Sequence, residues 1–115
     1  MVAIRNQEES DFINNLLPFN SKYYWIGIKK VAGVWTWEET NKTIPEDAQN
    51  WATEEPDNIE GQDCVEIYIK REKDTAKWNN ENCRSRKGTV CYSGKTYSIS
   101  FDGHIHWLLL NYYSM

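Results

Sequence analysis

The sequence lacks the features that place a chain in a membrane, on nucleic acid or among enzymes. Apolar runs are short, and the one at residues 107–110 holds four residues, whereas a membrane-spanning helix needs about 20. The formal net charge of −4 gives no electrostatic reason to expect nucleic acid or an anionic membrane as a partner. No nucleophile–base pair or phosphate-binding loop is recognisable. We therefore expect a chain that is not an enzyme, binds no nucleic acid and inserts no segment into a membrane.

We expect no secretory signal peptide at residues 1–6, and the number of cysteines is odd. The first apolar stretch is too short for a leader, and a helix-start signal follows at once. Three cysteines conflict with a simple secreted domain in which every thiol is paired. Cys64 and Cys83 enclose a loop of about 20 residues, whose closure could contribute ~3 kcal/mol. A zinc site would combine the three thiols with His104 and His106, but the absence of a short C-x-x-C pair argues against it.

What the sequence does have is a globular composition with many aromatic side chains. It contains six Trp and seven Tyr in 115 residues, of which 26% are charged, so we expect one folded domain with most tryptophans in its core. Asn6 is the expected N-cap of a helix whose apolar stripe includes Phe12 and Leu17, and Pro18 should stop it. Strands are expected at residues 2–4, 23–30, 34–37, 64–71, 77–78 and 88–92. This order predicts an α+β fold with a mainly antiparallel sheet.

A long polar segment, residues 38–63, separates two of these strands, and a loop of this length is usually functional. Its second half and the cysteine that follows it read WATEEPDNIEGQDC, and this stretch carries the carboxylates of Glu54, Glu55, Asp57, Glu60 and Asp63. A solvated acidic loop is one interpretation, and a calcium site is the other. Because Ca²⁺ takes about six to eight oxygen ligands, a single turn cannot supply the site and a strand must contribute. The stretch KWNNENC downstream is the candidate for that strand.

Several dispersed motifs together resemble the C-type lectin domain. WIGI, the E-P-x-x stretch, Cys64, the W-N-x stretch, Cys83 and Cys91 match the second half of that family's pattern. More narrowly, YYWIGIKK, NWA, EPDN, DCVEIYIKREKD and KWNNENC are similar to the selectins, the leukocyte-adhesion branch. The resemblance covers about residues 2–92. We therefore divide the chain into a partial C-type lectin-like domain at residues 1–92 and a tail at residues 93–115 that does not resemble the family.

The resemblance implies a C-type lectin-like fold with a long calcium and sugar loop and a disulfide between Cys64 and Cys83. The family's domain begins earlier, with a first strand and a helix that bears a cysteine, so we expect this chain to lack both. Cys91 should then be an orphan thiol, and the tail should be foreign to the fold. A circular permutation in which TYSISF replaces the first strand is the alternative, and the absence of a cysteine from the tail argues against it.

The resemblance also implies a set of calcium ligands. In the family, a Glu and an Asn from the E-P-N loop and an Asn and an Asp from the W-N-D strand bind the ion, and a cis proline aims the loop ligands. The same residues bind two adjacent sugar hydroxyls. Carried over by position, the metal ligands are Glu55, Asp57, Asn79 and Asn80, with Asn58 beside them and Pro56 as the cis proline.

Three positions depart from the family's pattern. Asp57 replaces the loop Asn, Asn80 replaces the strand Asp, and Gln62 stands where a further acidic ligand is usual, although Glu60 could move in to serve. The first two changes cancel in charge, so we expect the ion to be held, but more weakly. Asp57 accepts a hydrogen bond and donates none, which costs about 1–3 kcal/mol where a sugar hydroxyl needs a donor. We therefore expect calcium binding to be better retained than mannose- or fucose-type selectivity.

Further positions match residues that contact a fucosylated, sialylated glycan in selectins. Arg71 and Tyr68 suit a sialic acid carboxylate through guanidinium and hydroxyl hydrogen bonds. The plain alternative is that Glu66 and Tyr68 share one face of an alternating strand and that Arg71 ends it. The expected glycan-binding set is Glu55, Asp57, Asn58, Asn79, Tyr23, Glu66, Tyr68, Arg71 and Glu81.

The sequence thus predicts a calcium-dependent glycan-binding module of selectin type, used in cell adhesion or recognition. Ca²⁺ is the expected cofactor, and fucosylated or sialylated glycoproteins on cells are the expected partners. By resemblance the protein is extracellular or at the cell surface, where Asn41 in an N-K-T triplet would be a glycosylation site. Two alternatives are open, namely a lectin-like domain that has lost sugar binding and serves protein interaction, and a truncated product without function.

Overall fold

The structure, a computed structural model, describes residues 1–94 and 96–108 of the chain. Its helix α1 spans Gln7–Leu16. Asn6 caps this helix as predicted, because its side-chain oxygen accepts a hydrogen bond from the Glu9 backbone N–H at 2.8 Å. Ile13 and Leu17 are buried in the core, whereas Phe12 is exposed. The helix therefore contributes Ile13 to the core, and Leu17 at its C-cap continues the same narrow apolar stripe.

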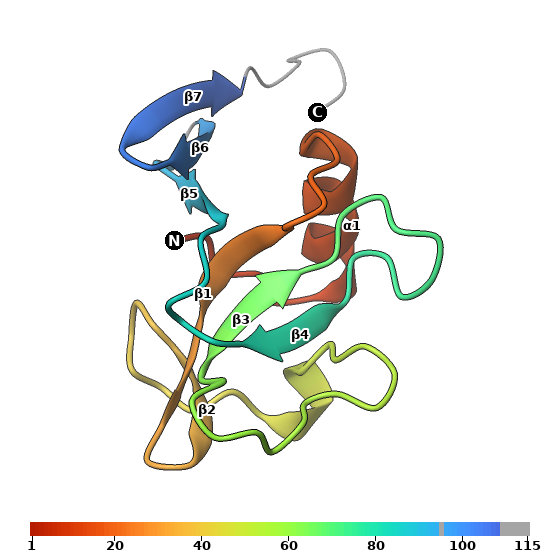
Figure 1. Cartoon of the computed structure of the whole chain (residues 1–115), viewed down its shortest axis with the longest axis vertical. Coiled ribbons are helices and arrows are strands. Elements are labelled where there is room, and N and C mark those ends of the chain that lie inside the picture. The colour runs from red at the N-terminus through yellow and green to blue at the C-terminus, as the bar shows by residue number, and fades with distance from the viewer. Residues whose placement is uncertain (95, 109–115) are drawn as a thin grey trace.

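A mixed sheet of seven strands, counted over the described residues, forms the body of the molecule (Figure 1). Its order is β4-β3-β1-β5-β6-β7, with β2 paired to β1. The β1–β5 pair is parallel and the other five pairings are antiparallel, which confirms the predicted α+β fold. The strands are β1 Tyr24–Val31, β2 Val34–Trp37, β3 Cys64–Ile67, β4 Trp78–Glu81, β5 Gly88–Tyr92, β6 Tyr97–Phe101 and β7 His104–Leu108.

Three of the predicted strands were wrong, and one of them, expected at residues 77–78, instead spans Trp78–Glu81. Residues 2–4 are extended but form no strand, because Val2 makes only two backbone hydrogen bonds to the sheet, from its N–H to the Val90 carbonyl and from Gly27 N–H to its own carbonyl. The strand expected at residues 64–71 ends at Ile67. Beyond it the backbone turns away, since Lys70 adopts a positive φ of 50° and donates its N–H to the Asn14 side chain.

The segment after Tyr92 extends the sheet. β6 pairs antiparallel with β5, and β7 pairs with β6 (Figure 1). Ile99 of β6 is 2% exposed and belongs to the hydrophobic core. A described part of residues 93–115 therefore contributes to the same core as the rest of the chain, contrary to the expectation of a segment foreign to the fold. The division of the chain at residue 92 by resemblance stays a prediction, and residues 109–115 lie outside the described part.

Tryptophans pack beneath the long loop between β2 and β3. Trp35, Trp37 and Trp78 are buried, as predicted, while Trp51 is half-buried. The Trp51 ring lies 4.8 Å from that of Trp35 and 5.5 Å from that of Trp78, measured between centroids. Ala52 N–H also donates to the Trp78 carbonyl at 2.9 Å. This aromatic cluster fixes the start of the acidic loop against β4, which carries the other half of the candidate site.

Candidate functional site

The acidic loop closes over β4 through one backbone amide. Glu55 and Pro56 are joined by a cis peptide bond, as the resemblance predicted. The N–H of Asp57 is shared by two acceptors, Glu55 Oε1 at 3.1 Å and Asn80 Oδ1 at 3.0 Å. The loop residues and the strand residue therefore meet in one place, although 23 positions separate Asp57 from Asn80.

Asn80 is the most enclosed residue of this group. It is 2% exposed, and its amide nitrogen donates to the Asp57 carbonyl, to Asp57 Oδ1 and to the Gln62 carbonyl at 3.0, 3.1 and 3.1 Å. Asn80 lies on β4 opposite Val65 of β3, so the sheet register sets its position. It fastens both ends of the loop segment 57–62 to the sheet.

Asn79, the preceding residue of β4, points to the other face and meets a buried charge. Its amide nitrogen donates to Glu66 Oε2 at 2.8 Å, and the two residues are directly paired across β3 and β4. Glu66 is 3% exposed, and its Oε1 lies 2.9 Å from Lys87 Nζ. The contact between Lys87 and Oε1 is an ion pair whose geometry is not that of a hydrogen bond. Lys87 therefore compensates the negative charge of Glu66, but Oε1 accepts no hydrogen bond from it.

Tyr68 and Arg71 stack beside the end of β3. The guanidinium carbon of Arg71 lies 4.0 Å from the centroid of the Tyr68 ring, and the Tyr23 ring meets Tyr68 edge-on at 4.9 Å. Burial raises the pKa of the Tyr68 hydroxyl, and a hydrogen bond with Arg71 and its charge oppose part of that rise. The hydroxyl is therefore protonated at neutral pH and can donate a hydrogen bond, while Arg71 is exposed and can meet an anion.

The remaining expected residues lie at the rim or elsewhere. Asn58 is exposed on the loop, and Glu81 at the end of β4 accepts a hydrogen bond from Asn82 N–H at 2.9 Å. Cys64 and Cys83 form the expected disulfide, and Cys91 is a free thiol on β5. Asn41 is exposed in the turn after β2.

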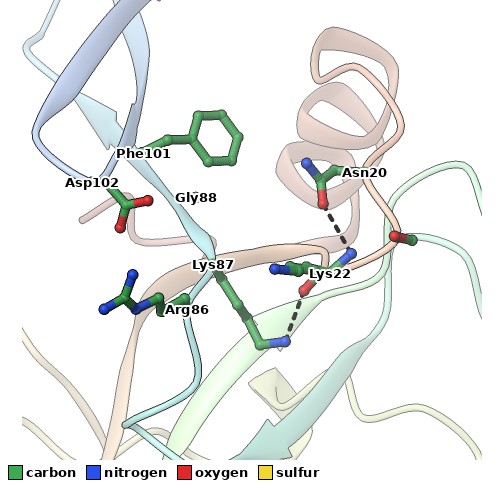
Figure 2. Close-up of a pocket in the computed structure, with 8 residues that line it drawn as sticks. Asn20, Lys22, Arg86, Lys87, Gly88, Phe101 and Asp102 are labelled. Carbon is green, nitrogen blue, oxygen red and sulfur yellow. Dashed lines mark hydrogen bonds between the residues drawn. The ribbon is translucent and has the colours of Figure 1, made fainter.

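Lys87 is the residue that sequence reasoning missed, because no periodicity or motif singled it out. It also donates to the Lys22 carbonyl at 2.7 Å and lies 5.3 Å from the Trp25 ring centroid. A cleft of about 420 Å³ opens beside it, and Figure 2 shows Lys87 reaching from one wall towards Lys22 on another. Three structural contacts thus fix this ammonium group beneath the candidate site.

The charges at the loop suit a cation. Burial raises the pKa of Glu55 above its usual value, and the neighbouring carboxylate of Asp57 raises it further. A bound cation would relieve both effects. No group of three or more His, Cys, Asp or Glu side chains is arranged around one point in residues 1–94 and 96–108, which includes the zinc set considered above. The donors are two carboxylates and amide oxygens, a set that calcium accepts and zinc does not prefer.

Comparisons with known proteins agree with the motifs. The family model described as "Lectin C-type domain" matches residues 1–93. The chain is 50% identical over 105 residues to L-selectin of Bos taurus and 49% identical over 105 residues to E-selectin of Homo sapiens. Both alignments cover 90% of this chain, but only 28% of the first relative and 17% of the second. The chain thus spans less than a third of the length of these relatives.

Proposed function

Because this chain belongs to the C-type lectin family, we propose that it binds glycans in a calcium-dependent manner, as a recognition module of selectin type. The observation that supports the proposal is the convergence of Glu55, Asp57 and Asn80 at one place, where burial and the Asp57 carboxylate both disfavour the charge of Glu55. The family is not enzymatic, as the sequence predicted. No helix among the described residues is long and apolar enough to cross a membrane.

The residues present fit calcium by the chemistry of their donors. Glu55 and Asp57 offer carboxylate oxygens, and Asn79 offers its amide oxygen because its nitrogen is used by Glu66. Asn58 is exposed beside them. The side-chain oxygen of Asn80 accepts one hydrogen bond, from Asp57 N–H, and has a second lone pair that could coordinate the ion. When bound, the ion would supply coordination sites for two neighbouring sugar hydroxyls. The protein residues would orient those hydroxyls by accepting and donating hydrogen bonds.

A second group of residues supports a glycan that carries an acid. Arg71 and the Tyr68 hydroxyl would bind a carboxylate such as that of a sialic acid, with Tyr23 packed behind the Tyr68 ring. Glu66 is buried and would act from behind the glycan by holding the Asn79 amide, while Glu81 would contribute from the rim. Fucosylated and sialylated glycoproteins at cell surfaces are therefore the proposed partners, and the proposed location is extracellular.

The identity of residue 57 affects the sugar more than the ion. A carboxylate can coordinate calcium and accept from a hydroxyl, but it cannot donate to one. An unmatched polar group costs about 1–3 kcal/mol, which is a large part of the free energy with which a single monosaccharide binds. We therefore expect weak binding of single mannose or fucose units and dependence on the additional carboxylate contact at Arg71.

Glycan-array binding of the purified chain, in calcium and in excess chelator, tests this proposal. The expected result is binding to acidic, fucosylated glycans that chelator abolishes. Arg71→Lys keeps the positive charge but removes the planar guanidinium, so it should weaken binding to sialylated glycans more than to neutral ones. Lys73→Arg, an exposed change of the same type, is the control. Binding that persists in chelator, or no binding in calcium by a folded chain, would contradict the proposal.

A protein-interaction surface without sugar binding is the second candidate function. It is favoured by the use of the Asn80 amide inside the protein and by Ile59, which is 59% exposed at the loop. An exposed apolar side chain at the rim suits a protein partner better than a sugar hydroxyl. The glycan array separates the two candidates, because only a glycan-binding module should bind the array in calcium and lose that binding in chelator.

A further inference from the structure

We infer that Asn80 and Gln62 hold the acidic loop in its binding shape without a metal ion, by supplying hydrogen-bond donors to Asp57. The inference deepens the proposed function, on whose site it rests, and it makes Asn80 a positioning residue for that loop. It also joins the three positions at which this sequence departs from the lectin pattern, Asp57, Gln62 and Asn80, into one connected cluster.

The Asp57 carboxylate is surrounded by donors from the protein. Oδ1 accepts from the Asn80 amide at 3.1 Å and from the Ile59 backbone N–H at 3.3 Å. In the amide orientation that satisfies both groups, the Gln62 nitrogen donates to Oδ1 at 2.7 Å and to Oδ2 at 3.1 Å. One negative charge is thus shared among two neutral amides and a backbone N–H, which stabilise it as a cation would.

Asn80 satisfies the backbone of the loop at the same time. Its nitrogen also donates to the carbonyls of Asp57 and Gln62, and its oxygen accepts from Asp57 N–H. A carboxylate at position 80 could still accept from Asp57 N–H, but it would face the other three oxygens with no donor. Such an arrangement of acceptors needs a cation between them. The asparagine removes that need.

Hydrogen–deuterium exchange of the loop in excess chelator tests the inference directly. A peptide covering residues 53–63 reports three hydrogen-bonded N–H groups of the loop. Asp57 N–H donates to the side chains of Glu55 and Asn80, Ile59 N–H donates to the Asp57 carboxylate, and Gln62 N–H donates to the Ile59 carbonyl. We expect clear protection of these amides in the wild-type chain without calcium. Exchange at the unprotected rate in a chain that still melts cooperatively would overturn the inference.

Asn80→Asp removes the donors and adds a like charge. Leaving a buried polar group without its partner favours local opening of the loop. Amide exchange of the loop in chelator should therefore accelerate by about ten- to a hundredfold. Asn15→Asp makes the same chemical change at an exposed position on α1 and should leave the loop unchanged. If Asn80→Asp prevents folding, Gln62→Glu at the half-buried rim of the cluster supplies the same test and should also accelerate exchange. Unchanged loop exchange in a folded variant of either kind would contradict the assignment.

Calcium separates the inference from the proposed function. Loop protection in chelator requires only the hydrogen bonds of Asp57, Asn80 and Gln62, so it can be present in a chain that binds no calcium. A calcium-dependent rise of the thermal midpoint tests metal binding independently. If the loop is protected in chelator but calcium does not raise the thermal midpoint, the inference stands and the proposed function fails. If calcium raises the midpoint but the loop is unprotected in chelator, the proposed function stands and the inference fails.

Discussion

The buried ion pair between Lys87 and Glu66 makes a quantitative prediction about stability. At 2.9 Å and an effective dielectric constant of about 20, the attraction is about 6 kcal/mol before desolvation is counted. Removing one partner of a buried pair typically costs about 3–5 kcal/mol, because the other charge stays buried without compensation. Glu66 keeps the Asn79 amide on Oε2, so we expect Lys87→Met to destabilise the fold by about 3 kcal/mol.

A double variant separates the uncompensated charge of Glu66 from the other interactions of Lys87. Lys87→Met also removes the bond to the Lys22 carbonyl and the interaction with Trp25, and the double variant Lys87→Met/Glu66→Gln lacks them as well. The double variant leaves no buried charge and should recover about 2 kcal/mol relative to Lys87→Met alone.

Urea denaturation followed by tryptophan fluorescence measures these differences, with the slope of the transition as a check on two-state behaviour. For a domain of this size the single variant should melt roughly 10 °C lower than the wild type. A loss of stability below about 1 kcal/mol, or a double variant as unstable as Lys87→Met, would refute the view that Lys87 neutralises a buried Glu66.

Three further changes test other parts of the molecule. A Cβ at Gly88 would lie 2.5 Å from the Phe101 ring, so Gly88→Ala should cost about 1–3 kcal/mol by denaturation, and Phe101→Leu should restore part of it if β6 packs there. The raised pKa of Glu55 means that its ionised form destabilises the fold at neutral pH relative to its protonated form. Glu55→Gln should therefore raise the thermal midpoint in chelator but reduce the increase that calcium produces. Asn41→Gln should abolish an endoglycosidase-sensitive mobility shift of chain made in a secretory system, since Asn41 is exposed in its triplet; a shift that persists would place the glycan elsewhere.

Much of the fold is encoded locally and could be predicted from the sequence. The Asn6 cap, the strands at residues 34–37 and 88–92 and the disulfide between Cys64 and Cys83 follow from short motifs or from the family pattern, and the structure confirms them. The cis bond before Pro56 likewise follows from the E-P-x-x motif through resemblance. Each of these features depends on neighbouring residues or on a dispersed motif that the sequence contains in full.

The features that the sequence could not predict depend on interactions between distant segments. Residues 2–4 are apolar like a short strand, but they sit between β1 and β5 and make too few ladder bonds to form one. Lys87 meets Glu66 across 21 positions, and no pattern in either segment indicates the pair. The link between Asp57, Gln62 and Asn80 was likewise hidden, because the sequence presents them as three separate departures and only the fold brings them together.

The measurement that tests the calcium site most directly is a thermal melt of the purified chain, followed by tryptophan fluorescence, in calcium and in excess chelator. A ligand that binds only the native state adds RT ln(1 + [L]/Kd) to the unfolding free energy, about 2.7 kcal/mol at a hundredfold excess over Kd. We expect calcium to raise the midpoint reversibly, and Asn79→Ala to abolish that increase while Asn15→Ala keeps it. A cooperative melt at the same midpoint in calcium and in chelator would contradict the calcium-dependent function proposed here.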